Sequence, residues 1–255
     1  MHQFSGTRFQ SVLILLLAVM ALSLIPSHKT YAEGPYLSCD PSEVHPIWWK
    51  ATVNYDLTTT VMETGEKVNL KRGDKVTLVS YNRIGVKTIM LDEDEEEHCK
   101  VPQNAVTAYE DACTPGDYKK NTKVRFVNSK KINSQTEYMI WVSTNMQSLN
   151  VFKGSNRNWE LVKSFRCSTG MAGYDTPIGY KVIQSKQLIF HSVQWGSNLQ
   201  YFMSFGGSGI HKWPGVGIEG NIGRHPCSHA CVRLGRSAAT WCYQNIPVGT
   251  RLLVY

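Results

Sequence analysis

HPCSHACVRL, residues 225–234, places two histidines and two cysteines at alternate positions around Ser228. Alternate residues of an extended chain point to one face. His225, Cys227, His229 and Cys231 would therefore form a row on one side of the chain. Such a row is compatible with a metal site, with part of a disulfide framework, or with a nucleophile and its assisting groups.

The metal and disulfide interpretations explain less of this stretch. A structural zinc ion needs four ligands in a tetrahedron, supplied by pairs that a long gap separates, whereas these four follow one another at two-residue spacing. We therefore expect no metal ion. A structural disulfide would use Cys227 and Cys231 but would leave Ser228, His229 and Arg233 without a role.

A cysteine nucleophile uses more of the residues. A thiol attacks as the thiolate, and its pKa of about 8.5 is lowered by nearby positive charge and backbone dipoles. His229 and Arg233 lie within two residues of Cys231, so we expect a lowered pKa there. The general base often comes from elsewhere in the sequence. His211 is the candidate, because it ends the glycine-rich stretch Gly206-Gly-Ser-Gly-Ile-His211, and glycines let a backbone approach a substrate closely.

These residues resemble the signature of the L,D-transpeptidase (YkuD-like) catalytic domain. That signature is a histidine followed downstream by Ser/Thr-His-Gly-Cys-x-Arg/Asn, and here 16 residues separate His211 from Ser228-His-Ala-Cys-Val-Arg233. Thr176-Pro-Ile-Gly179 resembles the family's Thr-Pro-x-Gly turn, and residues 241–255 resemble its closing helix and last strand. The resemblance covers residues 137–255. It implies a mainly β fold, with an L,D-transpeptidase-like β-sandwich and a short helix after the catalytic loop.

By this resemblance, the protein is expected to act on peptidoglycan stem peptides without a cofactor. Cys231 would attack the carbonyl of the third residue of a tetrapeptide stem and release the terminal D-alanine. An acceptor amine would take the resulting thioester to form a 3-3 cross-link. His211 would act as general base and then as general acid. Carbapenem β-lactams are expected to acylate Cys231, because their strained cyclic amide offers the thiolate a similar carbonyl.

The resemblance also assigns roles to the neighbouring residues. Ser228 and His229 would support the catalytic loop and bind substrate, although His229 is equally compatible with a structural histidine bonded to backbone. Backbone N–H groups near Ala230 and Cys231 would stabilise the oxyanion. Arg233 would hold the donor's carboxylate, since guanidinium pairs with carboxylate through two parallel hydrogen bonds.

Two positions depart from the family pattern. Ala230 stands where the family has glycine, and alanine adopts a positive φ only at a cost. Lys212 stands where a glycine usually follows the upstream histidine. The family orients that histidine through a neighbouring backbone carbonyl, so the side chain of Lys212 need not interfere. Lys212 is counted with Arg233 as a candidate substrate-binding residue.

Two other functions stay open. Water in place of the acceptor amine would make the protein an L,D-carboxypeptidase, and the choice of acceptor depends on the shape of the cleft. The other alternative is a protein that binds the cell wall with an inactive site. The joint presence of His211, Cys231 and Arg233 argues against that alternative.

The first 32 residues have the pattern of a secretory signal peptide. Arg8 precedes an apolar run at residues 12–25, and Thr30-Tyr-Ala32 offers a small-residue cleavage site. The run is short for a membrane span, which needs about 20 residues, although an uncleaved N-terminal anchor is an alternative. We expect a secreted, extracytoplasmic protein of the cell wall or periplasm, with no stable membrane span after cleavage.

The charge argues against nucleic acid as a partner. The chain has a net charge of +7, and cleavage after residue 32 would remove Arg8 and Lys29 but no acid, which leaves +5. The basic residues are spread along the sequence rather than gathered in the stripe or patch typical of nucleic-acid binding. A mild positive charge favours an anionic cell wall.

We divide the rest of the chain into three parts. Residues 33–113 contain short β-like runs, and they faintly resemble the small SH3-like β-barrels attached to bacterial wall enzymes. Residues 114–136 are a polar linker with the first elements of the next part, and residues 137–255 form the catalytic domain. We interpret the acidic run at residues 91–97 as a solvated loop, because a Ca²⁺ loop needs more ordered ligand spacing.

Strands dominate the predicted catalytic domain. Runs spaced about ten residues apart predict an antiparallel sandwich, at residues 137–142, 148–153, 161–167 and 179–185. Residues 237–245 are the one expected helix, which Ser237 would cap and Pro247 would end.

Seven cysteines follow the predicted signal peptide: Cys39, Cys99, Cys113, Cys167, Cys227, Cys231 and Cys242. An odd number leaves at least one thiol unpaired in an oxidising compartment. With Cys231 as the reactive thiol, several pairings of the other six are possible. We favour a Cys167–Cys227 bridge, which would tether the catalytic loop, and we expect Cys227 not to be the nucleophile.

Overall fold

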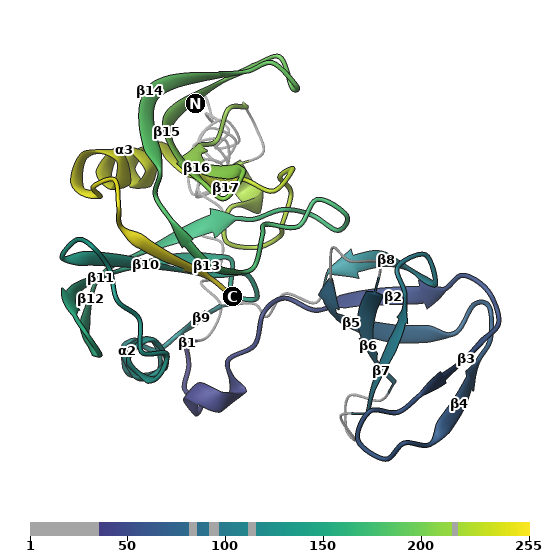
Figure 1. Ribbon diagram of the computed structural model, residues 1–255. Helices are drawn as coiled ribbons and strands as arrows, with labels where there is room; N and C mark the ends of the chain where they lie inside the picture. Colours follow the sequence, from purple (N-terminus) through teal and green to yellow (C-terminus); the bar gives the residue numbers. More distant parts are fainter. Residues whose placement is uncertain (1–35, 82–85, 92–96, 112–115, 216–218) are drawn as a thin grey trace, which may run out of the picture. The chain divides into compact units, whose positions relative to one another are not determined.

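The computed structural model describes residues 36–81, 86–91, 97–111, 116–215 and 219–255 (Figure 1). Gly34–Tyr255 form one compact unit. The predicted signal peptide and most of the acidic run lie outside the described residues. Within the described ranges, no helix is both long and apolar enough to span a membrane.

A nine-stranded sheet forms the larger part of the described fold. Its strands lie in the order β13 (Gly179–Val182), β18 (Arg251–Val254), β10 (Tyr138–Ser143), β11 (Ser148–Ser155), β12 (Asn158–Ser168), β17 (Val232–Leu234), β16 (Ser208–Lys212), β15 (Ser197–Phe205) and β14 (Ser185–Ser192). Two pairs, β10–β18 and β16–β17, are parallel, and the others are antiparallel. The shorter elements are β1 (Tyr36–Leu37), β9 (Asp117–Tyr118), η1 (Pro41–Glu43) and η2 (Glu219–Asn221).

The sheet curls around one apolar core (Figure 1). Ile140 of β10 and Val232 of β17 come from different parts of the sheet, yet they lie in one buried cluster with Cys242 of the following helix. Three predicted strands correspond to β10, β11 and β12, whereas the fourth, at residues 179–185, is divided between β13 and β14. The mainly β fold class predicted from the sequence is confirmed.

Helix α3 (Arg236–Asn245) follows β17 and packs against this core through Ala238, Ala239 and Cys242. It ends before Pro247, which has no N–H to continue the helical hydrogen bonds. The predicted cap was wrong: the helix begins one residue before Ser237, and its N-cap is Gly235, which has no side chain to cap it. The short helix after the catalytic loop is confirmed.

Helix α2 (Lys120–Ser129) corrects the expectation that residues 237–245 are the one helix. Its sequence, KNTKVRFVNS, is mostly polar, and Thr122 and Lys123 are buried beside Phe126 and Val127. An apolar stripe is the usual sign of a packed helix. Because polar residues lie on the buried face of α2, its sequence lacks a continuous apolar stripe.

Residues 49–111, which we call the N-terminal β module, have a sheet of their own. The strand order is β7 (His98–Pro102), β6 (Val86–Met90), β5 (Lys75–Tyr81), β2 (Trp49–Val53) and β8 (Val106–Asp111), with a separate hairpin of β3 (Leu57–Thr60) and β4 (Lys67–Leu70). Trp49, Leu78 and Ile89 lie in a buried cluster within the module. Its SH3-like character and the domain boundaries stay predictions.

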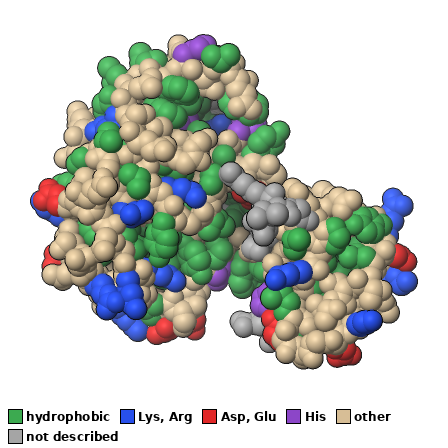
Figure 2. Space-filling view, viewed as in Figure 1, with side chains coloured by type: hydrophobic (Ala, Val, Ile, Leu, Met, Phe, Trp, Pro, Cys, Tyr) green, Lys and Arg blue, Asp and Glu red, His purple; other side chains and the backbone are tan. Residues whose placement is uncertain are grey.

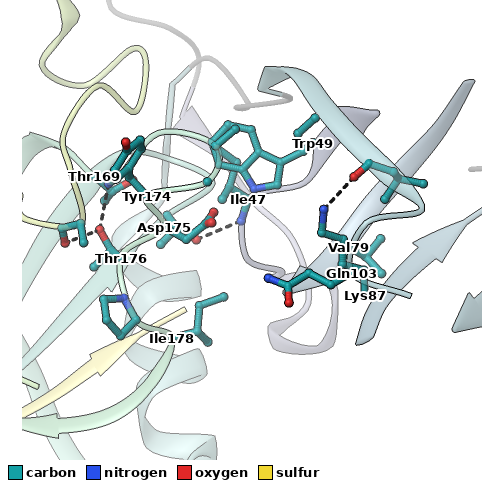
Figure 3. A pocket seen from close by; sticks show the side chains of 18 of the residues that line it. Ile47, Trp49, Val79, Lys87, Gln103, Thr169, Tyr174, Asp175, Thr176 and Ile178 are labelled. Carbon is teal, nitrogen blue, oxygen red and sulfur yellow. Dashed lines mark hydrogen bonds between the residues drawn. The ribbon is translucent and has the colours of Figure 1, made fainter. Parts of the chain in front are cut away.

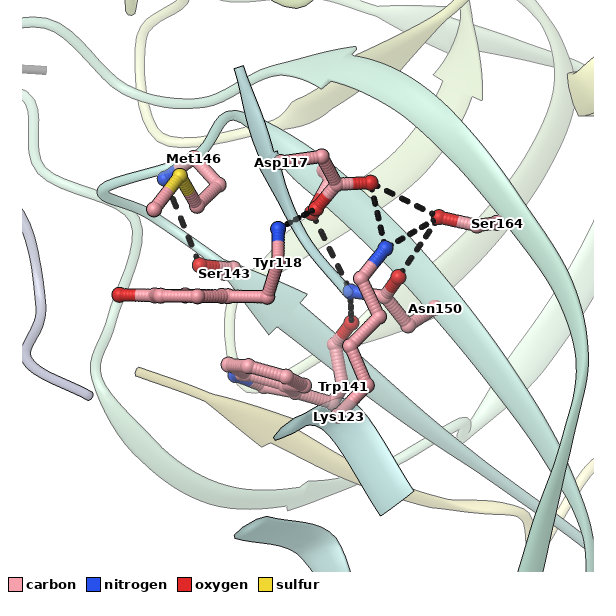
Figure 4. Close-up of polar contacts among 9 residues, drawn as sticks. Asp117, Tyr118, Lys123, Trp141, Ser143, Met146, Asn150 and Ser164 are labelled. Carbon is pink, nitrogen blue, oxygen red and sulfur yellow. Dashed lines mark hydrogen bonds and ion pairs between the residues drawn. The ribbon is translucent and has the colours of Figure 1, made fainter. Parts of the chain in front are cut away.

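A buried ion pair anchors α2 to the nine-stranded sheet (Figure 4). The side chain of Lys123 is 3% exposed and donates to Asp117 of β9 and to the Ser164 hydroxyl of β12, the latter at 2.8 Å. The Asp117 carboxylate also accepts from the Ser148 hydroxyl at 3.1 Å and from the Tyr118 backbone N–H at 2.8 Å. Burial lowers the pKa of Lys123, and the Asp117 carboxylate opposes this shift.

Asp117→Asn is expected to destabilise the protein by about 3–5 kcal/mol, because it leaves the Lys123 charge buried without a carboxylate. Lys123→Met should cost only about 1 kcal/mol, because the Asp117 side chain is 21% exposed and keeps three other donors. Urea unfolding with a shared slope measures both free energies. Equal losses in the two variants would contradict the role assigned to the buried charge.

Candidate active site

The parallel pairing of β16 with β17 brings the predicted catalytic residues to adjacent strands. The register places His211 of β16 opposite Arg233 of β17. Cys231 directly precedes β17. The chain leaves the sheet after Lys212 and returns to it at Val232, so that residues far apart in sequence become neighbours.

His211 is held as a neutral base. It is 2% exposed, and its Nδ1 lies 2.6 Å from the carbonyl oxygen of Lys212. Since a carbonyl only accepts, Nδ1 carries the proton and Nε2 keeps its lone pair. Burial lowers the pKa of His211 to about 4; the Lys212 carbonyl opposes this shift, and the Arg233 charge adds to it. His211 is therefore able to accept a proton at neutral pH.

Lys212 contributes its backbone to the site through this carbonyl. Its side-chain Nζ donates to the Gln200 amide oxygen of β15 at 3.2 Å. The side chain is thus tied to the neighbouring strand while the carbonyl orients His211. Substrate binding by Lys212 stays a prediction.

Burial raises the pKa of the Cys231 thiol above its ordinary value. The Ser208 hydroxyl, the Gly209 backbone N–H and the Arg233 charge act in the opposite direction but do not outweigh burial. The expectation of a lowered pKa was wrong for the free site, because the enclosing chain removes water that would stabilise a thiolate. The site therefore combines a neutral thiol with a neutral imidazole, and loss of the thiol proton must accompany attack.

The catalytic loop, residues 227–231, is tied to the end of β12 and to the chain that follows it. Backbone N–H groups of Cys227 and Ser228 both donate to the Thr169 carbonyl at 3.0 Å. The Ser228 hydroxyl, which is fully buried, donates to the Cys231 carbonyl. Ala230 has a φ of 85°, the left-handed region that favours glycine. The energetic cost of a positive φ, which the sequence predicts for an alanine in place of glycine, therefore applies to Ala230.

His229 lies between two aromatic rings. It stacks on Trp195 with ring centroids 3.9 Å apart, and it meets the edge of Tyr174 at 4.7 Å. Tyr174 and Trp195 are each about half exposed, at 48% and 45%. The sequence analysis missed both of them, because they lie on separate turns with no motif that relates them to His229. These aromatic faces are suited to contact a ligand beside the catalytic loop.

Arg233 is built into the site. Its Nη1 donates to the Cys227 carbonyl at 2.8 Å, and its guanidinium lies 4.5 Å from the ring centroid of Trp213. Nε is buried, and no described residue accepts its proton. The guanidinium has further N–H groups besides the one bonded to Cys227, and carboxylate binding by Arg233 stays a prediction.

The predicted Cys167–Cys227 bridge is absent. All six described cysteines have free thiols, Cys167 and Cys227 among them. The Cys227 sulfur lies 2.9 Å from the Ser168 hydroxyl. Successive residues of a strand point to opposite faces, and Cys167 accordingly lies in the apolar core. The two sulfurs therefore belong to different sides of β12.

Metal ligands do not gather in the part of the chain that the structure describes. No group of three or more His, Cys, Asp or Glu side chains there could hold a metal ion. On the face in Figure 2, Lys and Arg side chains are interspersed with acidic and neutral ones.

Residues 137–254 match the family model of the L,D-transpeptidase catalytic domain, YkuD. Over these residues the chain is similar to L,D-transpeptidase catalytic domains. It contains the thiol, the base and the catalytic loop described above. No curated protein matches the sequence.

Solved structures with similarity to the chain include L,D-transpeptidases. A fused Zn-dependent amidase/peptidase/peptidoglycan-binding protein from Clostridium acetobutylicum is 27% identical with a TM-score of 0.46; the match covers 53% of this chain and 59% of that one. An L,D-transpeptidase from Stackebrandtia nassauensis is 26% identical, with coverage of 54% and 68% and a TM-score of 0.41. L,D-transpeptidase 3 from Mycobacterium tuberculosis, in complex with a faropenem-derived adduct, is 14% identical, with coverage of 80% and 94% and a TM-score of 0.40. The chain thus spans less than two thirds of the Clostridium protein.

A cavity of about 950 Å³ reaches the catalytic loop of the L,D-transpeptidase-like domain at Ala230 (Figure 3). The Trp49 indole N–H donates to the Asp175 carboxylate at its wall, and burial raises the pKa of Asp175 to about 6. Lys87, also at the wall, donates to the Val106 carbonyl at 2.7 Å. Asp175 and Lys87 thus already have partners within the protein.

Ala230→Gly is expected to stabilise the L,D-transpeptidase-like domain by about 0.5–1 kcal/mol. Removal of Cβ relieves a left-handed φ that costs about 1–2 kcal/mol, and the greater freedom of glycine in the unfolded chain offsets part of the gain. The matched control Ala238→Gly, in helix α3, should instead lose about 1 kcal/mol. Denaturant unfolding measures both, and a loss of similar size at position 230 would contradict strain at Ala230.

The acylation rate of the L,D-transpeptidase-like domain is expected to fall as the pH decreases through about 4, because His211 must be neutral to accept the thiol proton. With a solvated histidine, the acylation rate would instead fall near pH 6.5. Stopped-flow reaction with p-nitrophenyl acetate measures the profile. Circular dichroism at each pH is the control that the protein stays folded. The pKa of His211 is lower in the folded than in the unfolded protein, so the free energy of unfolding decreases as the pH falls below about 6.5. A fall in the acylation rate near pH 6.5, while the protein is still folded, would contradict the assignment of a buried base.

Proposed function

We propose that the protein is an exported, cysteine-dependent L,D-transpeptidase that forms 3-3 cross-links between peptidoglycan tetrapeptide stems. One observation carries the proposal: the Cys231 thiol contacts Ser208 and Gly209 of β16, the strand that also supplies the neutral base His211. The proton acceptor therefore lies on β16, and the nucleophile lies at the start of the neighbouring strand β17. The catalytic domain family of residues 137–254 supports the substrate class.

The first half-reaction is acylation of Cys231. The sulfur attacks the carbonyl carbon of the third stem residue while His211 Nε2 takes the thiol proton. The bond to the terminal D-alanine nitrogen then breaks, and His211 returns the proton to that nitrogen. D-Alanine leaves as the free amino acid, and the stem remains as a thioester on Cys231.

The second half-reaction transfers the stem to an amine. The side-chain amine of a second stem attacks the thioester carbonyl, and the carbon–sulfur bond breaks. The proton lost by the amine returns to the sulfur through His211, which leaves the site as it began. Water at the same position would give a tripeptide, the product of an L,D-carboxypeptidase.

Two groups are suited to hold the donor stem. Arg233 retains donor capacity beside the thiol and would pair with a donor carboxylate. His229, with the exposed faces of Tyr174 and Trp195, would contact less polar parts of the stem. Lys212 would contribute only if its contact with Gln200 gives way to substrate.

Export is proposed from residues 1–32, whose charged start, short apolar run and small-residue exit are typical of a secretory signal peptide. The substrate requires the same location, because peptidoglycan lies outside the cytoplasm. The mild positive charge of the remainder favours association with an anionic wall. We therefore propose a secreted protein of the cell wall or periplasm.

Carbapenem β-lactams are proposed inhibitors for a chemical reason. Attack by Cys231 on the strained cyclic amide opens the ring, so the carbonyl carbon becomes bonded to sulfur and the ring nitrogen takes the proton from His211. The leaving nitrogen stays attached to the acyl group. The adduct therefore persists where a stem peptide would be transferred.

Incubation of the protein with disaccharide-tetrapeptides is expected to release D-alanine and yield cross-linked dimers, measured by mass spectrometry. Cys231→Ala should yield neither, because it lacks the nucleophile, and it should also form no adduct with imipenem. The matched control is Cys227→Ala, which removes a thiol four residues earlier and should keep both reactions.

Each other outcome has a distinct meaning. Tripeptide without dimer would identify an L,D-carboxypeptidase, and no product at all from folded protein would favour a wall-binding protein with an inactive site. Dimers from Cys231→Ala, or loss of reaction only in Cys227→Ala, would exclude Cys231 as the nucleophile.

A further inference from the structure

The carbonyl oxygen of Ala230 accepts hydrogen bonds from two buried hydroxyl groups. Thr176 Oγ1 donates to it at 2.9 Å, and Ser208 Oγ donates at 2.6 Å. Thr176 Oγ1 also accepts from the Gly170 backbone N–H at 2.9 Å, which leaves its own proton for Ala230 (Figure 3). Thr176 and Ser208 are only 3% and 6% exposed. Water therefore competes little for these bonds.

The same peptide unit carries the N–H of the nucleophile. The carbonyl of Ala230 and the N–H of Cys231 belong to one planar trans peptide, so they point in opposite directions. Two hydroxyls that fix the oxygen therefore also fix the direction of the N–H. Among the described residues, no acceptor takes the hydrogen bond of the Cys231 N–H. This N–H is available to an atom that is not part of the protein.

The backbone at this point needs external support. Ala230 has a φ of 85°, and an alanine keeps such a conformation only where the surrounding structure holds it. The two hydroxyls come from different elements, since Ser208 begins β16 and Thr176 lies before β13. They hold the peptide unit from two sides.

We propose that Thr176 and Ser208 are positioning residues for the oxyanion hole. They hold the Ala230 carbonyl so that the Cys231 N–H faces the oxygen that becomes negative when the thiol attacks an acyl carbon. This inference rests on the proposed acyl-transfer function of Cys231. Ser208 also contacts the thiol, whereas the Thr176 hydroxyl bonds only to backbone groups, at Ala230 and Gly170, so Thr176 separates the two effects.

Two reactions of Cys231 distinguish positioning from general damage. Acylation by imipenem or by p-nitrophenyl acetate passes through an oxyanion. Alkylation by iodoacetamide displaces iodide at a saturated carbon and forms no oxyanion. The ratio of the acylation rate to the alkylation rate therefore reports on the oxyanion hole, and changes in the exposure or pKa of the thiol affect both rates.

Thr176→Val removes the hydroxyl at nearly constant volume and is expected to lower the ratio about 10–100-fold, below the loss for direct removal of an oxyanion donor. Alkylation should change less than about twofold, because the thiol and His211 are untouched. Thr176→Ser restores the hydroxyl and should return the ratio to near wild type. Thr122→Val, the same change at a buried threonine of α2, is the control and should leave the ratio unchanged.

Ser208→Ala should lower both rates, and the ratio as well, because Ser208 serves the thiol and the carbonyl. If Thr176→Val does not fold, Ser208→Ala is the variant that tests the proposal. An unchanged ratio in the folded variants would overturn the proposal, as would a fall in Thr176→Ser as large as in Thr176→Val. A protein that makes no cross-links but shows the expected ratios would refute the L,D-transpeptidase function and leave the positioning role standing.

Discussion

The parallel pairing of β16 with β17 is the constraint on which the site depends. Parallel neighbours cannot be joined by a tight turn, so the chain between them must leave the sheet and return. It returns as the catalytic loop, which brings Cys231 against Ser208 and Gly209 at the start of β16. Ile210 and Val232, paired across these strands, are completely buried. A one-residue slip would turn them out of the core, so packing fixes the register of the site.

Burial then sets the protonation of the two reacting groups. Removal of water disfavours charge on both of them, so the pKa of the Cys231 thiol rises and that of His211 falls. Burial also lowers the pKa of Lys123, but there the Asp117 carboxylate, a direct partner of opposite charge, opposes the shift. The free site thus favours neutral reactants, and charge develops only when a substrate carbonyl arrives.

Support for the catalytic loop comes from several parts of the chain. The residue that follows β12 supplies the Thr169 carbonyl to the start of the loop, and hydroxyls from β16 and from the segment before β13 hold Ala230 near its end. Each support is a hydrogen bond to backbone. Backbone bonds of this kind leave side chains such as His229 and Arg233 available to contact a ligand.

The sequence by itself determined which residues carry the proposed chemistry. His211, Cys231 and the surrounding loop form a motif because their spacing is local, and the four strong strand runs show their period in the same way. The turn at Thr176 was visible as a motif too, but its bond to Ala230 was not, because the two residues lie 54 positions apart in the sequence. Helix α2 escaped prediction because its buried face holds Lys123, whose partner comes from β9 and β12.

Only the tertiary structure decided the environment of those residues. The raised pKa of the Cys231 thiol, the positive φ of Ala230 and the aromatic rings around His229 all arise from groups brought together by the curled sheet. The separation of Cys167 from Cys227 follows from the face of β12 to which each belongs. Sequence patterns record which side chains are present and at what period. Desolvation and backbone orientation depend on neighbours distant in sequence, and these are set only when the strands pair.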